Sequence, residues 1–120
     1  MTNTHLDSPP ASERQSEIII DRFKDMMGKY PMFTTGDFNF KDYEEGYKIF
    51  TKSMFDSQET AIKNLSGINY TYNGFGTSNS HRIDFIFHNS LVQPVEYKIL
   101  NDDFGGYVSD HYGIYTKYSF

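Results

Sequence analysis

The sequence contains no cysteine, which excludes a disulfide framework, a thiolate zinc site and a cysteine nucleophile. It also lacks an apolar run long enough to cross a membrane. No basic segment followed by an apolar stretch opens the chain, so we expect no signal peptide and take the cytoplasm as the default location. Basic residues are scarce too: 11 Lys and Arg stand against 16 Asp and Glu, a net charge of −5. That balance argues against a general nucleic-acid-coating surface, although a bound metal ion could still supply positive charge in a phosphate-cleaving pocket.

Aromatic residues are abundant and offset the shortage of aliphatic ones. The chain has 120 residues, including 11 Phe and 10 Tyr. This length suits one domain, which we assign to residues 1–120. Large rings bury much area per residue, so we expect a core built on Phe and Tyr.

The spacing of apolar residues predicts helices in the first half of the chain. Residues 11–27 form the clearest one, with apolar side chains at helical spacing, and Gly28 is its expected stop. A second helix is predicted over 42–53, although Gly46 weakens that prediction. Another helical turn is expected within 56–65.

Strands dominate the second half. Residues 2–6 resemble the tail of a strand, and the other predicted strands are 31–35, 69–72, 82–87, 95–100 and 113–118. The composition of 73–80 and 101–110 predicts loops. Early helices and late strands together predict a mixed α/β or α+β layered sandwich.

Polar residues interrupt this apolar framework at four places, three of them where a predicted strand begins or ends and one, Asp84, inside the strand predicted at 82–87. They are Asn3-Thr4-His5-Leu6-Asp7, Gly36-Asp37-Phe38-Asn39, Asp84, and Ser109-Asp110-His111. Strand ends and the loops beyond them form the ligand cleft in many layered α/β folds. Asp and Asn oxygens suit hard cations such as Mg²⁺, and histidine can move a proton near neutral pH. These residue types together suit phosphate-ester hydrolysis, which needs charge neutralisation and an activated water.

Each of these places also has a plain structural interpretation. Strand alternation alone would put Asp84 beside Arg82 on a polar, solvent-facing side. Gly36-Asp37-Phe38-Asn39 could be an ordinary Asx-type turn. A lone histidine is more often a simple hydrogen-bonded residue than a catalyst. The order of all four places along the chain is what favours an active site, and no Gly-x-Ser-x-Gly motif or P-loop competes with it.

That order resembles four successive signatures of the endonuclease/exonuclease/phosphatase family. The third signature is Arg82-Ile83-Asp84-Phe85-Ile86-Phe87, and the fourth extends to Tyr112. Arg14 and Gln15 resemble the usual continuation of the first. Thr71-Tyr72-Asn73-Gly74-Phe75 resembles a Thr-Phe-His-Gly-Phe-like segment of one branch of these hydrolases.

The resemblance implies a role for each matching residue. Asp37 would orient or activate the attacking water, and Asn39 would help to bind the scissile phosphate. Asp110 would contribute to binding Mg²⁺ or Mn²⁺. His111 would contact the phosphate and stabilise developing negative charge. Two further roles complete the set: Asp84 would hold the His111 ring, and His5 would be a second phosphate-contacting histidine.

Other polar and aromatic residues are secondary candidates. Arg82 could bind phosphate through both of its terminal nitrogens, although a surface arginine is the simpler expectation. Tyr72 and Phe75 border the Gly-rich loop at the predicted cleft and are candidate substrate contacts. We expect His81 and His88 to be surface residues.

The resemblance also implies that this chain corresponds to the C-terminal half of a four-layer fold. Family members are about twice as long, and their first half supplies an Asn and the principal metal-binding Glu. We therefore expect a missing N-terminal half or self-association to cover an apolar sheet face. The substrate would be a phosphoester, either a small molecule, slightly favoured by the acidic charge, or a nucleic acid. The alternative is a catalytically silent fragment that folds only with a partner chain or with itself.

Overall fold

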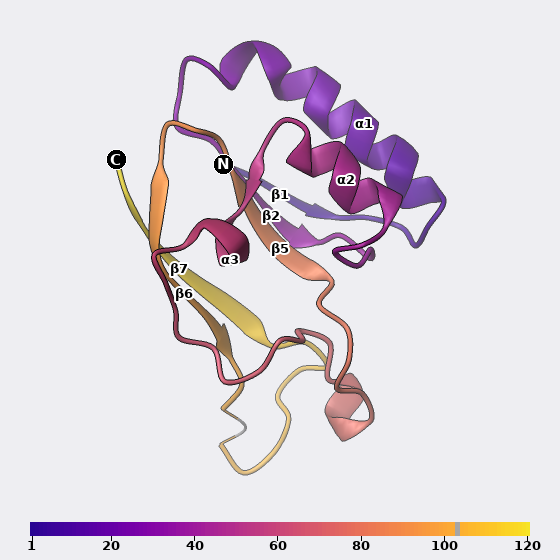
Figure 1. The fold of residues 1–120 in the computed structure, drawn as a ribbon. Coiled ribbons are helices and arrows are strands. Elements are labelled where there is room, and N and C mark those ends of the chain that lie inside the picture. Colours follow the sequence, from indigo (N-terminus) through magenta and orange to yellow (C-terminus); the bar gives the residue numbers. More distant parts are fainter. Residues whose placement is uncertain (103) are drawn as a thin grey trace.

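The computed structural model describes residues 1–102 and 104–120 and shows a mixed α/β fold, as predicted (Figure 1). Two short 3₁₀ turns, Lys24–Met26 and Gly74–Gly76, lie among the longer elements. In chain order, the helices and strands are β1 (Thr2–His5), α1 (Ala11–Phe23), β2 (Phe33–Asp37), α2 (Glu45–Thr51), β3 (Phe55–Asp56), α3 (Ser57–Thr60), β4 (Lys63–Asn64), β5 (Asp84–His88), β6 (Gln93–Leu100) and β7 (Gly113–Ser119).

The strands form two sheets. The first has the order β1-β2-β5-β3, with β1 parallel to β2 and the other neighbours antiparallel. The second has the order β4-β6-β7, and its long antiparallel β6–β7 pair carries a register shift between Pro94 and Glu96. Within the described residues, no helix is long and apolar enough to cross a membrane.

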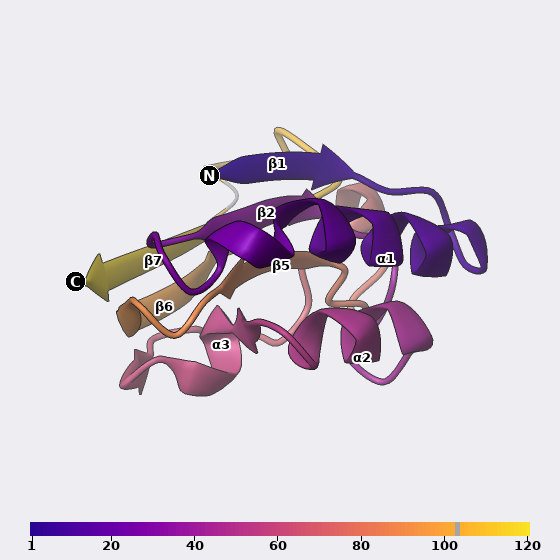
Figure 2. The same ribbon diagram turned by 90° about the horizontal axis from the view of Figure 1, so that it is seen from above.

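The hydrophobic core lies between the first sheet and the helices α1 and α2, which pack side by side (Figures 1 and 2). Phe85 and Phe87 alternate along β5 and point to this side, where α1 contributes partly buried apolar residues such as Ile19 and Phe23. Since successive strand residues face opposite sides, Asp84 and Ile86 lie on the face that the two helices do not cover. The buried core residues are Leu6, Met32, Phe38, Phe40, Phe50, Met54, Phe85 and Phe87.

The predicted helices are present, and the second is shorter than expected. The 11–27 prediction corresponds to α1 and the 3₁₀ turn that follows it. α2 begins only at Glu45 because the chain first makes a turn, in which the Glu44 N–H donates to the Lys41 carbonyl at 3.0 Å. Gly46 stands inside α2 because a side chain there would collide with the ring of Phe40. The turn predicted within 56–65 is α3, capped by the Asp56 carboxylate, which accepts the Gln58 N–H at 3.1 Å.

The predicted strand at 69–72 is wrong. The N–H groups of Thr71 and Tyr72 both donate to the His81 carbonyl, at 2.9 and 3.1 Å, so no regular ladder develops. Only isolated bridges form, from Tyr72 to His81 and to His111. The predicted loop at 101–110 is irregular over its described part, and Asp103 lies outside the described residues.

Candidate active site

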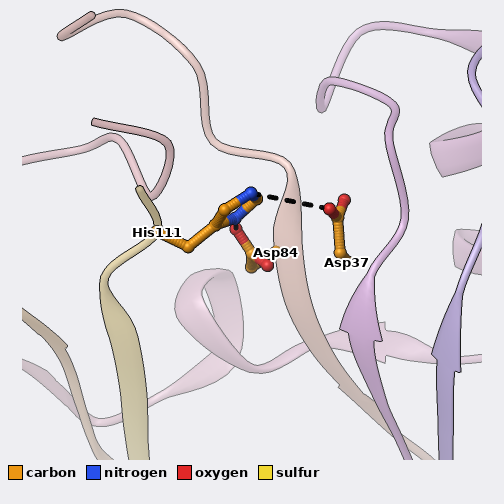
Figure 3. Close-up of side chains that lie close together, drawn as sticks. All are labelled: Asp37, Asp84 and His111. Carbon is orange, nitrogen blue, oxygen red and sulfur yellow. Dashed lines mark hydrogen bonds and ion pairs between the residues drawn. The ribbon is translucent and has the colours of Figure 1, made fainter. Parts of the chain in front are cut away.

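Asp37, Asp84 and His111 come together at one end of the first sheet (Figure 3). Asp37 is the last residue of β2 and pairs directly with Asp84, the first residue of β5. His111 precedes β7 and reaches this pair from the second sheet. One ligand-type atom from each of the three side chains lies within 4.8 Å of the others. These residues come from three of the four polar places in the sequence, and the fourth place supplies His5, which lies beside Asp37.

The His111 ring is held by Asp84. The distance from Nδ1 of His111 to Oδ2 of Asp84 is 2.7 Å. Burial raises the pKa of Asp84 above its ordinary value, against the lowering effect of hydrogen bonds from His111 and Thr71. Burial lowers the pKa of His111, but the hydrogen bond and charge of Asp84, with the charges of Asp37 and Asp110, outweigh it and raise that pKa. Because Nδ1 is engaged by Asp84, His111 presents Nε2 to the site.

Asp37 lies between two imidazole rings. Its Oδ1 accepts the Asn39 N–H at 2.9 Å, which fixes the carboxylate. Its Oδ2 is 3.4 Å from Nε2 of His5 and 3.7 Å from Nε2 of His111. The His5 side chain is 75% exposed, so it approaches Asp37 from solvent. A carboxylate flanked by two imidazoles can orient a water molecule and exchange protons with either ring.

Gly36 makes the close approach of β1 possible. Its φ of 143° lies in a region that L side chains rarely adopt, and a Cβ there would collide with the backbone of Thr4. The parallel register places His5 directly beside Asp37. The glycine of the predicted Gly-Asp-Phe-Asn motif is thus required by backbone geometry.

Asn39 joins the loops that follow β1 and β2. Its Nδ2 donates to the Leu6 carbonyl at 2.6 Å, and its φ is 51°. The Leu6 N–H in turn donates to the Asp37 carbonyl at 2.9 Å. The structure thus gives Asn39 a structural contact, while its contact with phosphate stays a prediction.

The carboxylate of Asp110 lies outside the three-residue cluster, although its charge raises the pKa of neighbouring His111. Its backbone carbonyl accepts the N–H groups of Asn73 and Gly74, at 2.8 and 3.1 Å. Its predicted role in metal binding stays a prediction.

Tyr72 and Phe75 lie near His111 in different ways. The Tyr72 ring meets the His111 ring edge to face, with 5.3 Å between centroids. Phe75 is 61% exposed and has a φ of 56°. Tyr72 therefore packs against a site residue, whereas Phe75 has an exposed ring and its contact with substrate stays a prediction.

Arg82 is not a surface residue, contrary to the simpler expectation. Its side chain is 4% exposed, and Nη2 lies 2.9 Å from Oδ2 of Asp56. The guanidinium covers the Phe85 ring at 4.6 Å, so it does not share the face of Asp84. The prediction that strand alternation puts Arg82 beside Asp84 is wrong because β5 begins only at Asp84 and Arg82 precedes it. A substrate contact would require Arg82 to leave Asp56, so we do not include this residue in the proposed site.

His88 is also buried, at 4% exposure, and the prediction of a surface residue is wrong. Its Nε2 is 2.8 Å from the Thr60 hydroxyl, and its Nδ1 is 2.7 Å from the Asn89 carbonyl. His81 is half-buried. Neither histidine belongs to the cluster of Asp37, Asp84 and His111.

Two residues that hold the site were not singled out from the sequence. Thr71 is fully buried and Asn73 is 1% exposed. Asn73 Nδ2 donates to the Ser109 carbonyl at 3.1 Å, and its Oδ1 accepts the Phe75 N–H at 2.8 Å. In the sequence they are visible only as two polar residues of the Thr-Tyr-Asn-Gly-Phe segment. Their hydrogen-bond partners are known only from the folded chain.

A hollow of about 250 Å³ adjoins the cluster on the face without helices. Its described lining residues include Asp37, Asp84 and Asn3 but no Lys or Arg. Two carboxylates, without a basic side chain among the described residues that line the hollow, fit a divalent cation.

Comparison with known proteins yields structural neighbours alone: neither a family model nor a curated protein sequence matches the chain. An endonuclease/exonuclease/phosphatase protein from Bacteroides vulgatus has a TM-score of 0.85 and 28% identity, over 96% of this chain and 47% of its own. A mannosyl-6-phosphatase from Bacteroides thetaiotaomicron has a TM-score of 0.88 and 25% identity, over 98% and 50%. A conserved protein of unknown function from Enterococcus faecalis has a TM-score of 0.86 and 27% identity, over 98% and 48%.

The fold is the one that these endonuclease/exonuclease/phosphatase and phosphatase structures share. The resemblance to the endonuclease/exonuclease/phosphatase family is confirmed over nearly the whole chain. The chain spans about half the length of each of these neighbours.

Proposed function

We propose that this chain carries one half of the active site of a metal-dependent hydrolase of phosphate esters. The observation that supports it most is the cluster of Asp37, Asp84 and His111 at a hollow, in a fold shared with phosphatases. The proposal treats residues 1–120 as a single partial domain, the C-terminal half of the family fold.

Mg²⁺ or Mn²⁺ is the proposed cofactor. Asp37 would hold it within the cluster, and Asp110 would support it from the adjoining loop. When bound, the ion would neutralise phosphate charge and lower the pKa of a water molecule. Asp37 is suited to orienting that water because its Oδ2 is free of the Asn39 N–H bond.

The remaining residues would act on the phosphate. His111, protonated and held by Asp84, would donate a hydrogen bond from Nε2 to a phosphoryl oxygen as negative charge develops there. His5 lies across Asp37 and would assist the leaving oxygen. Asn39 would use its remaining amide hydrogen to bind the phosphate.

A small phosphoester is the substrate class we favour over nucleic acid. The net charge of −5 would repel a long polyanion. A second hollow, of about 160 Å³, adjoins His111 and is lined by Tyr107 and Tyr112 among others. Aromatic rings suit the flat apolar face of a sugar or an aryl leaving group. A neighbouring structure is a mannosyl-6-phosphatase, which also acts on a small substrate.

The second half of the site would come from a segment that packs on the face without helices. Phe33 and Ile86 are half-buried there, and a hollow of about 380 Å³ runs beside them to Ile114 and Tyr118. The occupant would be an N-terminal half or a second copy of this chain. A chain that is catalytically silent without that occupant is the second candidate, favoured by the half-length match to its neighbours.

The test is hydrolysis of a phosphomonoester and a phosphodiester with Mg²⁺, with Mn²⁺ and with chelator. We expect metal-dependent turnover that His111→Ala lowers by about 100-fold or more. His81→Ala is the matched control, because His81 lies outside the cluster. Turnover that persists in chelator or in His111→Ala would contradict the proposed mechanism. No turnover, even after an N-terminal half is added, would favour the silent chain.

A further inference from the structure

Thr71 lies between the two segments that carry Asp84 and His111. It is fully buried and follows no regular strand. On one side it contacts the residues that lead into β5, and on the other it contacts the residue after His111. A single residue, through its side chain and its backbone, is thus bonded next to both members of the pair.

The Thr71 hydroxyl holds the backbone at the start of β5. Its Oγ1 accepts the N–H groups of Ile83 and Asp84, each at 3.1 Å. A hydroxyl has two acceptor lone pairs, so these two bonds use its acceptor capacity. The same hydroxyl contributes to lowering the pKa of the Asp84 carboxyl, against the larger raising effect of burial. Where β5 begins, the hydroxyl thus accepts backbone N–H groups that the carbonyls of a neighbouring strand would otherwise accept.

The Thr71 backbone completes the connection. Its carbonyl accepts the Tyr112 N–H at 2.7 Å, directly after His111. Two residues further on, the Asn73 N–H donates to the Asp110 carbonyl at 2.8 Å. The segment before His111 and the segment after it are therefore both tied to the residues around Thr71.

We propose that Thr71 is the positioning residue of the Asp84–His111 pair. Its hydroxyl fixes the backbone of Asp84 from one side while its own backbone holds the His111 segment at hydrogen-bonding distance. Without the hydroxyl, two part-buried N–H groups would lose their acceptor, and the start of β5 that carries Asp84 would loosen. The functional meaning of this role rests on the proposed hydrolase, but the positioning itself is a property of the folded chain.

Two substitutions separate the hydroxyl from the shape of the side chain. Thr71→Val keeps the shape and removes the hydroxyl, whereas Thr71→Ser keeps the hydroxyl. Thr34→Val is the matched control: Thr34 is 2% exposed on β2, and its hydroxyl bonds to Thr2 and Met54, away from Asp84. If Thr71→Val does not fold, Thr71→Cys replaces it, since a thiol is a weak donor and acceptor of similar size.

The first readout needs no metal and no turnover. It is the proton NMR signal of the His111 Nδ1–H, which a 2.7 Å bond to Asp84 should protect from exchange with water. We expect the signal in the wild type, Thr71→Ser and Thr34→Val, and its loss through faster exchange in Thr71→Val. The second readout is Mn²⁺ affinity, expected to fall about 10-fold or more in Thr71→Val. Where turnover is measurable, kcat should fall while KM changes little.

The outcomes are distinguishable. An unchanged His111 signal in Thr71→Val, or equal losses in Thr71→Val and Thr34→Val, would overturn the positioning role. A Cys variant that behaves like Thr71→Ser would overturn it as well. If the signal responds as expected but the wild type neither binds Mn²⁺ nor hydrolyses a phosphoester, the positioning role stands and the proposed hydrolase fails.

Discussion

The two faces of the first sheet differ sharply in how deeply this chain buries their residues. On the helix-covered face, Phe85 and Phe87 are at most 1% exposed. Phe87 stacks on Phe50 with 4.8 Å between ring centroids and meets Phe38 edge to face at 5.2 Å. On the other face, Ile86, between those two residues, is only half-buried.

The difference shows that one sequence pattern serves two purposes. Alternation along β5 builds a finished aromatic core on one side and places Asp84 and Ile86 on the side that holds the candidate site. That second face is closed at one end, where Tyr118 of β7 packs on Phe33 with 4.6 Å between centroids. It is open around the hollow next to Asp37 and Asp84. The chain covers about half the length of its structural neighbours, which agrees with a sheet face that this chain leaves uncovered.

The largest effect on stability is expected from a residue of the helix-covered face of the first sheet. Phe87→Ala should lower the free energy of unfolding by about 4 kcal/mol, through lost burial and the cavity it leaves. Ile86→Ala, one residue away on the open face, should cost only about 1 kcal/mol. Urea unfolding measures both. Equal losses would mean that the open face is buried in solution, and a dependence of the Ile86→Ala loss on protein concentration would identify self-association as the cause.

A somewhat smaller effect is expected from the buried ion pair of Arg82 and Asp56, which lies beside Phe85 of the helix-covered face. Arg82→Met should cost about 3 kcal/mol, because Asp56, whose side chain is 2% exposed, would lose its counter-ion. Asp56 also caps α3 and accepts the Tyr47 hydroxyl at 3.0 Å. Asp56→Asn keeps the cap through Oδ1, lets Nδ2 donate to the Tyr47 oxygen, and removes the charge, so we expect the double variant to regain more than half of the loss. No recovery in urea unfolding would show that Arg82 acts by packing on Phe85 instead.

The sequence could predict the features that depend on local pattern. Alternation placed Phe85 and Phe87 on one face, and the order of the polar motifs brought forward Asp37, Asp84 and His111, which meet in the structure. Both signals survive folding because strand periodicity and strand-end position are local properties.

The features that depend on long-range partners could not be predicted. Arg82 points inward because it pairs there with Asp56, which lies 26 residues earlier in the sequence, and because β5 begins only after Arg82. The 69–72 segment has the Tyr and Thr residues that favour a strand, but the N–H groups of Thr71 and Tyr72 converge on one carbonyl. Thr71 shows no sign in the sequence of the two hydrogen bonds that its hydroxyl accepts.

The smallest effect concerns the closed end of the second face, where His88 is buried beside Tyr118 and Phe55. Burial lowers the pKa of His88, although the Asn89 carbonyl and the charge of Asp56 oppose the shift. The unfolded chain therefore binds a proton more readily than the folded chain, so the contribution of His88 to stability is full above the unfolded pKa and is lost as pH falls from about 6.5 toward 5. His88→Gln should make the loss of stability between pH 7 and pH 5 shallower, by no more than about 1 kcal/mol. Urea unfolding at pH 7, 6 and 5 measures this slope, with His81→Gln as the control for a half-buried histidine. A slope unchanged in His88→Gln would mean that the closed end admits water and that His88 titrates there as it does in the unfolded chain.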